Sequence, residues 1–280
     1  MADQPTQWKT ATNRLVQLGD SIIAQLEGFG EFSRFCAATG YWAVRQPAGY
    51  GRLHLLLPQL YIIGVRSIPV VMLVGAFVGA VIGIETYSQF ASIGQESKLG
   101  GVIALSVVKQ IGPVLAAVMI AGRVGGAVSA EVGTMRVTEQ LDALRVMGTD
   151  PIQHLVVPRV LACVIMLPVL TIFSDILGIA GGYLVVSVGH GVDRSDYWDF
   201  SAQLVTSWDV LTGLIKSVFF GLFIGLIACY KGFHCESGAA GVGKAATQSF
   251  VAGFIAIIVS NFFLAQFLNT LDPLIHAMLD

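Results

Sequence analysis

Charged residues are scarce in this sequence. Only 12% of its 280 residues are Asp, Glu, Lys or Arg, and 55% are hydrophobic, with a mean hydropathy of +0.74. Soluble domains average about 25% charged residues. The net charge of −2 provides no basic field of the kind that attracts nucleic acid. The composition therefore indicates a membrane protein and excludes a nucleic-acid partner.

Catalytic and metal-binding patterns are also missing. The four cysteines lack paired metal spacing, and neither H-E-x-x-H nor G-x-S-x-G occurs. Residues 238–245, GAAGVGKA, approach the phosphate-binding loop G-x-x-x-x-G-K-[ST]. However, Ala245 replaces the hydroxyl that would hold Mg²⁺, and no strand is expected before the loop. We expect no catalytic residue, no metal and no cofactor bound directly by this chain.

Long apolar runs, by contrast, are abundant. A hydrocarbon core of about 30 Å needs about 20 apolar residues per helix. Five runs meet this length, at approximately residues 64–87, 102–130, 155–188, 210–230 and 246–271. The predicted fold class is an all-α integral membrane protein with five transmembrane helices.

The amino-terminal region, residues 1–60, has a more polar composition than the membrane domain predicted for residues 61–280. It lacks the compact apolar core and cleavage site of a signal peptide. Apolar residues recur at helical spacing among polar ones: Leu15, Leu18, Ile22, Leu26 and Phe29. This pattern predicts an amphipathic helix on the membrane surface, with a soluble helix packed on a partner as the alternative.

Positive charge sets the expected orientation. Arginine and lysine gather at the amino end and in the connections after the second and fourth spans. Because cytoplasmic loops carry this excess, the amino terminus is predicted to be cytoplasmic and the carboxyl terminus periplasmic. Residues 190–209 then form an acidic outer loop with Trp198 and Trp208 as interfacial anchors.

Gly75, Gly79 and Gly83 repeat every fourth residue in the first span. Such a ridge lets another backbone approach closely, so these residues are predicted to pack against a helix. The pattern leaves open whether that helix belongs to the same chain or to a second copy.

Residues 131–151 read EVGTMRVTEQLDALRVMGTDP and lie between the second and third spans. Val137, Leu141 and Leu144 fall on one face of a short amphipathic helix, predicted at about residues 135–148. Gly148 and the Asp150–Pro151 pair end it. This helix suits a groove in a cytoplasmic partner, or alternatively lies flat on the headgroups.

Polar groups inside membrane spans are costly and are functional candidates by default. The candidates for an intramembrane polar path are Glu85, Lys109, Gln110, Arg123, Glu131 and Asp175. Lys216 also lies in the fourth span. For Asp175 and Lys109 we expect an interhelical ion pair or hydrogen-bonded cluster to offset the cost. A purely structural role is the alternative for all of them.

Four stretches together resemble the MlaE permease family of bacterial lipid transporters. They read AGRVGGAVSAEVGTMRVTEQLDALRVMGTDPIQHLVVPRVLA, KQIGPVLAAVMIAGR, LPVLTIFSDILGIAGG and GVGKAATQSFV. The resemblance extends from about Tyr61 to the end of the fifth span. Many relatives carry Arg-Glu-Leu-Gly-Pro where this chain has Lys109 to Pro113, so Gln110 replaces an acidic residue.

The resemblance implies a permease of the bacterial inner membrane that moves phospholipids and helps maintain outer-membrane lipid asymmetry. It implies a homodimer with cytoplasmic ATPase subunits that bind ATP and Mg²⁺, a STAS-domain subunit and a periplasmic MCE-domain ring. Lys109 is then a candidate to attract the lipid phosphate. The short loop helix becomes the ATPase-coupling helix, carried by Arg136, Val137, Glu139, Gln140, Leu141, Leu144, Arg145 and Met147.

Other functions remain open from the residues alone. Asp175, Glu85 and Lys109 also suit an ion-coupled secondary transporter, although five spans form no clean inverted repeat. An intramembrane enzyme using Asp175 and a structural anchor for an outer partner are further alternatives.

Overall fold

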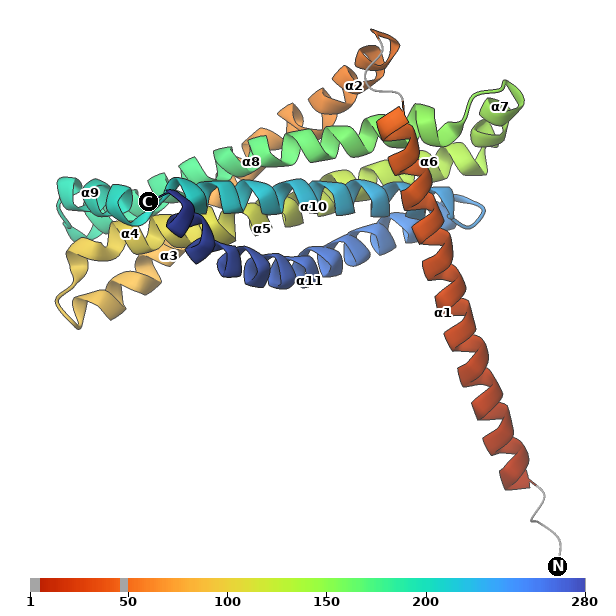
Figure 1. Cartoon of the computed structure of the whole chain (residues 1–280), viewed down its shortest axis with the longest axis horizontal. Helices are drawn as coiled ribbons and strands as arrows, with labels where there is room; N and C mark the ends of the chain where they lie inside the picture. Colours follow the sequence, from red (N-terminus) through yellow and green to blue (C-terminus); the bar gives the residue numbers. More distant parts are fainter. Residues whose placement is uncertain (1–5, 46–49, 280) are drawn as a thin grey trace, which may run out of the picture. The chain divides into compact units, whose positions relative to one another are not determined.

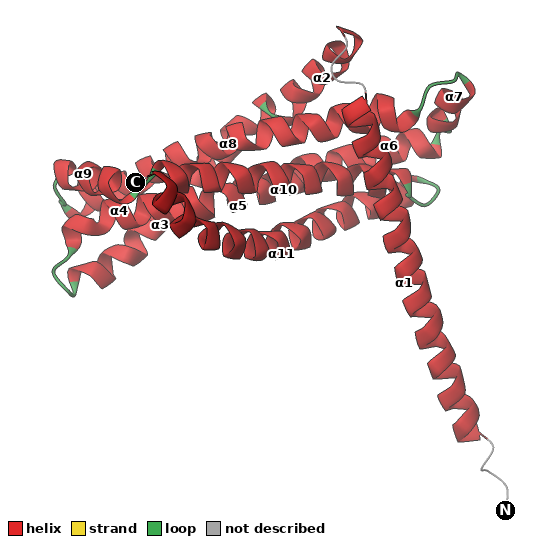
Figure 2. Cartoon of the chain, in the orientation of Figure 1, coloured by secondary structure: helices red, strands yellow, loops and turns green. Residues whose placement is uncertain are grey.

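The computed structural model describes the backbone of residues 6–45 and 50–279, and the side chains of residues 26–45 and 54–271. Within these ranges the regular structure is helical throughout and contains no strand (Figure 2). Five helical segments are long and apolar enough to cross a membrane: His54–Ala91, Glu96–Val137, Ile152–Gly189, Ser207–Phe233 and Ala239–Leu271. The predicted all-α membrane fold with five spans is confirmed, and the segments are longer than predicted because their helices continue into polar flanks.

The chain divides into two compact units, Met1–Pro47 and Ala48–Asp280. The first contains one helix of 40 residues, α1 (Thr6–Arg45), on which Leu26 and Phe29 are exposed. The predicted amino-terminal helix is therefore confirmed as a helix. The side chains of Leu15, Leu18 and Ile22 lie outside the described residues, and placement on the membrane surface stays a prediction.

The second unit holds all five spans. Its elements are α2 (Tyr50–Ile63), η1 (Val65–Ser67), α3 (Ile68–Ala91), η2 (Glu96–Lys98), α4 (Leu99–Ser106), η3 (Val107–Ile111), α5 (Gly112–Ile120), η4 (Ala121–Gly125), α6 (Gly126–Val137), α7 (Gln140–Val146), η5 (Ile152–Val156), α8 (Val157–Tyr183), η6 (Leu184–Gly189), α9 (Arg194–Leu204), α10 (Ser207–Phe233) and α11 (Ala239–Leu279). The long helix α8 contacts α3, α5 and α10, and α11 contacts α10 and α6. The helix α7 lies at one end of this bundle and α9 at the other (Figure 1).

The glycine ridge of the first span packs inside the same chain. A Cβ atom added to Gly79 would lie 1.8 Å from the carbonyl oxygen of Gly178, and one added to Gly75 would lie 2.7 Å from that of Ser174. A Cβ on Gly83 would meet Val186 at 3.3 Å. Only small residues allow α3 and α8 to approach this closely. The ridge is thus used within one chain, and the homodimer stays a separate prediction.

Wide π-helical turns interrupt the second span at η3 and η4. A π turn departs from the regular α-helical hydrogen-bond ladder and often marks a functional segment. In both turns a side chain from another helix reaches a backbone carbonyl: Lys216 Nζ donates to the oxygen of Lys109 at 3.0 Å, and Ser249 Oγ to that of Gly125 at 3.2 Å. The neighbouring spans therefore stabilise the irregular backbone.

Residues 190–209, expected as an acidic loop, are mostly helical. Asp193 caps α9 by accepting a hydrogen bond from the Ser195 amide at 2.8 Å, a common helix-start signal. Tyr197 is fully buried and donates its hydroxyl to the carbonyl oxygen of Ile179 at 3.0 Å. Trp198 stays partly exposed beside Tyr197. The segment is therefore a packed cap at the α9 end of the bundle.

Candidate functional site

Lys109 forms an ion pair at the start of the fourth span. Its Nζ lies 3.0 Å from Oδ1 of Asp209, which the sequence analysis had placed in the outer segment. Asp209 also accepts hydrogen bonds from the backbone and hydroxyl of Thr206, at 3.0 and 2.7 Å, in a capping box. The expected ion pair that offsets the cost of placing the Lys109 charge in a membrane span is therefore present. Its partner is a capping-box carboxylate that accepts two further hydrogen bonds.

Lys216 is the most deeply buried cation of this region, with 1% of its surface exposed. Its ammonium group donates to Gln110 Oε1 at 2.7 Å and to the carbonyl oxygen of Lys109 at 3.0 Å. Because position 110 is glutamine, these two acceptors are neutral. Sequence reasoning placed Lys216 in the fourth span without a partner, since nothing in the sequence links it to Gln110.

Asp175 is buried against the start of α5. A Cβ added to Gly112 would lie 1.7 Å from Asp175 Oδ1, so only glycine leaves space for this carboxyl group. Within the described part of the chain, no group forms a hydrogen bond with Oδ1. None of the ion pairs among the described side chains includes Asp175. The expected polar cluster therefore forms around Lys109 and not around Asp175.

A second ion pair lies towards the α7 end. Arg159, with 4% of its side chain exposed, places Nη2 2.7 Å from Oε1 of Glu131. It also donates to the carbonyl oxygen of Leu155 at 3.1 Å. The sequence analysis predicts Glu131 as a candidate and does not single out Arg159. The position of Arg159 inside the apolar run at residues 155–188 is the feature of the sequence that indicates a buried charge. Glu85, by contrast, is exposed on α3.

The predicted coupling helix at residues 135–148 is wrong as a single helix. Helix α6 ends at Val137, and the backbone turns through Glu139, whose φ of 60° lies in the left-handed region. A new helix, α7, runs only from Gln140 to Val146. Arg136 and Val137 therefore belong to the end of the second span. Gly148, at φ 75°, follows α7 as predicted.

The two ends of α7 have different surroundings. Leu141 is 1% exposed and belongs to the core of this chain, so it is unsuited to a partner groove. Val146 and Met147 are 89% and 69% exposed, although both are apolar. Beside them a cavity of about 330 Å³ is lined by Met135, Gln140, Ala143, Leu144, Met147, His154 and Leu155. Val146 and Met147 therefore form an exposed apolar projection next to an apolar cavity. Glu139 and Arg145 are exposed nearby.

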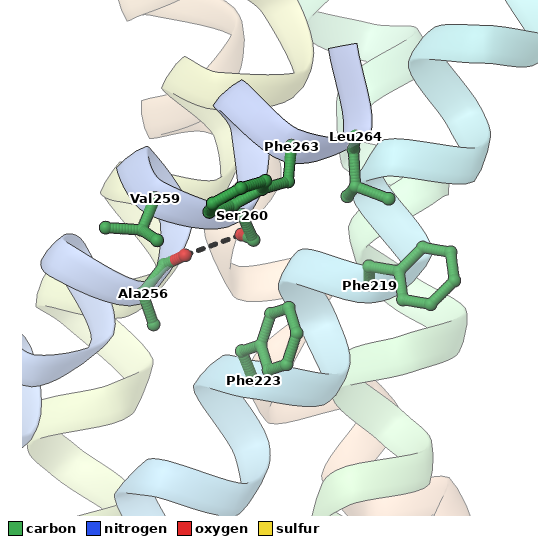
Figure 3. A pocket seen from close by; sticks show the side chains of 7 residues that line it. All are labelled: Phe219, Phe223, Ala256, Val259, Ser260, Phe263 and Leu264. Carbon is green, nitrogen blue, oxygen red and sulfur yellow. Dashed lines mark hydrogen bonds between the residues drawn. The ribbon is translucent and has the colours of Figure 1, made fainter. Parts of the chain in front are cut away.

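An apolar groove of about 470 Å³ lies between α10 and α11 (Figure 3). It is lined by Phe219, Phe223, Ala256, Val259, Ser260, Phe263 and Leu264. The only hydroxyl in this lining, Ser260 Oγ, donates back to the carbonyl oxygen of Ala256 at 2.5 Å (Figure 3). With its polar group satisfied within the helix, the groove presents a hydrocarbon-like wall.

Comparison with known proteins agrees with this architecture. The family model described as Permease MlaE matches residues 56–267. The intermembrane phospholipid transport system permease protein MlaE of Haemophilus influenzae is 35% identical over 90% of this chain and 96% of its own length. A probable ABC transporter permease protein of Rickettsia bellii is 39% identical over 89% and 95%, and one of Synechocystis is 44% identical over 75% and 80%. The chain belongs to the MlaE permease family and is a multi-pass, transmembrane ABC transporter permease of the inner membrane.

Proposed function

We propose that this chain is the permease subunit of an ATP-driven phospholipid transporter that works between the inner membrane and a periplasmic MCE-domain partner. In this role it helps maintain outer-membrane lipid asymmetry. Two copies form a homodimer, a separate cytoplasmic ATPase subunit binds ATP and Mg²⁺, and a STAS-domain subunit completes the cytoplasmic assembly. The permease itself carries no catalytic residue.

The observation that carries the proposal is the exposed apolar end of α7. Val146 and Met147 project from a helix outside the candidate spans and are largely uncovered by this chain. The exposed apolar side chains and the apolar cavity beside them are suited to contact a hydrophobic groove in a partner protein. A nucleotide-driven movement of that partner would then be transmitted through α7 to α6 and α8.

Phospholipid as cargo is supported by two observations. The Haemophilus relative is named as a phospholipid transport permease. In this chain, the groove between α10 and α11 presents an apolar wall that suits acyl chains. Charge supports a cytoplasmic location for the α7 end, because Arg145 lies in α7, Arg136 at the end of α6, Lys231 near the end of α10 and Lys244 near the start of α11.

Co-purification from native membranes tests the proposal. Tagged wild-type permease should retain an ATPase subunit, ATPase activity and phospholipid identified by mass spectrometry. The variant Val146→Asp/Met147→Asp should lose the ATPase while remaining in the membrane, since both side chains are exposed. The matched control Val188→Asp changes a residue that is 72% exposed near the opposite end and should retain it.

Unchanged ATPase recovery with Val146→Asp/Met147→Asp would contradict the coupling role of α7. Transport driven by a pH gradient, without any ATPase and abolished by Asp175→Asn, would instead favour the ion-coupled transporter. Asp175 is the residue to test because its buried Oδ1 has no hydrogen-bond partner among the residues that the structure describes.

A further inference from the structure

Two arginine residues contact each other where the first and second spans meet, through the side chain of Arg123 and the backbone of Arg66. Arg123, in the π turn η4, donates through Nη1 to the carbonyl oxygen of Arg66 and to Ser67 Oγ, the latter at 2.9 Å. Arg66 lies in η1, the joint between α2 and α3, and its guanidinium carbon is 5.7 Å from the centre of the Tyr61 ring. Both arginine side chains are exposed. We name this pair the joint arginines.

The joint arginines have no negative partner in the described part of the chain. The ion pairs there join Lys109 to Asp209, Arg145 to Asp142, Arg159 to Glu131 and Lys244 to Glu236. An exposed cation without a carboxylate partner in the protein attracts anions from its surroundings. The more buried cations Lys109 and Arg159 are neutralised within the protein, whereas this exposed pair is left for an external anion.

The contacts also fix the geometry of the pair. Arg123 is anchored through Nη1, and Nη2 and Nε of its planar guanidinium have no hydrogen-bond partner among the described residues. Arg66 is held beside an aromatic ring, a favourable site for a cation. Guanidinium groups bind phosphate through two parallel hydrogen bonds, and pre-positioned groups bind with less loss of conformational freedom.

The position along the second span points to a lipid as the source of the anion. This helical segment has 42 residues and is about 63 Å long, roughly twice a hydrocarbon core of about 30 Å. Arg123 precedes the end of the segment at Val137 by about 21 Å. For a segment centred in the bilayer, Arg123 then lies within about one helical turn of the hydrocarbon boundary. From that depth the long arginine side chain extends towards the phosphate and glycerol groups of the leaflet on the α7 side.

We propose that Arg66 and Arg123 form a binding site for the phosphate group of a phospholipid in the leaflet on the α7 side. The acyl chains would lie against the exposed apolar side chains of α2, η1 and α3, which include Ile62, Val65 and Val70. The inference deepens the proposed function, on which it rests for the identity of the lipid as cargo. Binding itself is measurable without transport.

Native mass spectrometry on the full-length permease with its co-purified partners tests the site. The probes are dioleoyl phosphatidylglycerol and dioleoylglycerol, which share acyl chains but differ in the phosphate. Arg66→Gln/Arg123→Gln should weaken retention of the phospholipid by about tenfold or more, without affecting the diacylglycerol. Arg123→Lys should give an intermediate loss, because lysine keeps the charge but not the paired hydrogen bonds.

The control is Lys98→Gln/Arg194→Gln, which removes two exposed positive charges near the opposite end of the bundle and should leave retention unchanged. Equal phospholipid retention by Arg66→Gln/Arg123→Gln and wild type would overturn the proposal. Inorganic phosphate that displaces the lipid completely would show a free-phosphate site and would also overturn it. The ATPase recovered in the same samples reports separately on the proposed function, so failure of one is distinguishable from failure of the other.

Discussion

Lys216 and Gln110 form a partly buried hydrogen bond of 2.7 Å between the fourth and second spans. The same ammonium group reaches the carbonyl oxygen of Lys109 inside the π turn η3. Lys109 in turn forms an ion pair with Asp209 through its side chain. One lysine thus supports both the irregular backbone of η3 and the residue that forms the neighbouring ion pair.

Replacing Lys216 with methionine should destabilise the permease. The change removes this donor from Gln110 Oε1 and from the Lys109 carbonyl oxygen, and a hydrogen bond to a charged group contributes about 1.5–3 kcal/mol. Thermal unfolding in detergent measures the effect. Lys244→Met is the control, since its ion pair with Glu236 is exposed and contributes about 0–1 kcal/mol. Equal unfolding temperatures for the two variants would argue against a supporting role of Lys216.

Gly79→Ala should disrupt the packing of α3 on α8. The added Cβ would lie 1.8 Å from the Gly178 carbonyl oxygen, so one of the two backbones has to move, at a cost of about 1–3 kcal/mol or more. Gly243→Ala in α11 is the matched control, because no atom lies within 4 Å of its added Cβ. Yield of folded protein and thermal stability should fall for Gly79→Ala alone. A normal Gly79→Ala protein would mean that α3 and α8 are less closely packed.

Leu141→Ala should destabilise the α7 end of the bundle by about 2–5 kcal/mol, because a fully buried leucine leaves a cavity. Met147→Ala, at an exposed position, should change stability by no more than about 0.5 kcal/mol. Chemical unfolding of the two variants in the same detergent provides the comparison. A small effect of Leu141→Ala would show that this side chain faces a partner and not the core.

Asp193→Ala should loosen α9 in a pH-dependent way. Hydrogen bonds from the Ser195 hydroxyl and amide hold the pKa of the Asp193 carboxyl below its usual range. Its stabilising effect is therefore present above the unfolded-state pKa of about 3.9 and is lost as pH falls through the lower folded-state value. Hydrogen exchange of the α9 amides should be faster in Asp193→Ala than in wild type at neutral pH, and the difference should vanish in strong acid.

The matched control for this measurement is Asp199→Ala, which alters an exposed carboxylate inside α9 that is not its amino-terminal cap. It should leave the exchange rates near those of wild type. Identical exchange in Asp193→Ala and wild type at neutral pH would show that the cap does not stabilise α9.

Much of the fold is determined by local sequence. The five spans follow from apolar length, because a segment in hydrocarbon must satisfy its backbone hydrogen bonds internally and becomes a helix. The stop after α7 follows from Gly148, which adopts a φ of 75° that other residues disfavour. The glycine ridge likewise predicts close packing, because its spacing of four residues places all three glycines on one face.

The tertiary structure alone decided which groups meet. Gln110 and Lys216 are 106 residues apart, and no local pattern records that their helices are adjacent. The helix breaks at Glu139 and Leu141 is buried in the core, and the helical periodicity through residues 135–148 reveals neither feature. Sequence therefore determined which segments enter the membrane, because that depends on each segment's own hydrophobicity. The pairing of charges and the exposed end of α7 depend on contacts between distant helices, which only the packed bundle specifies.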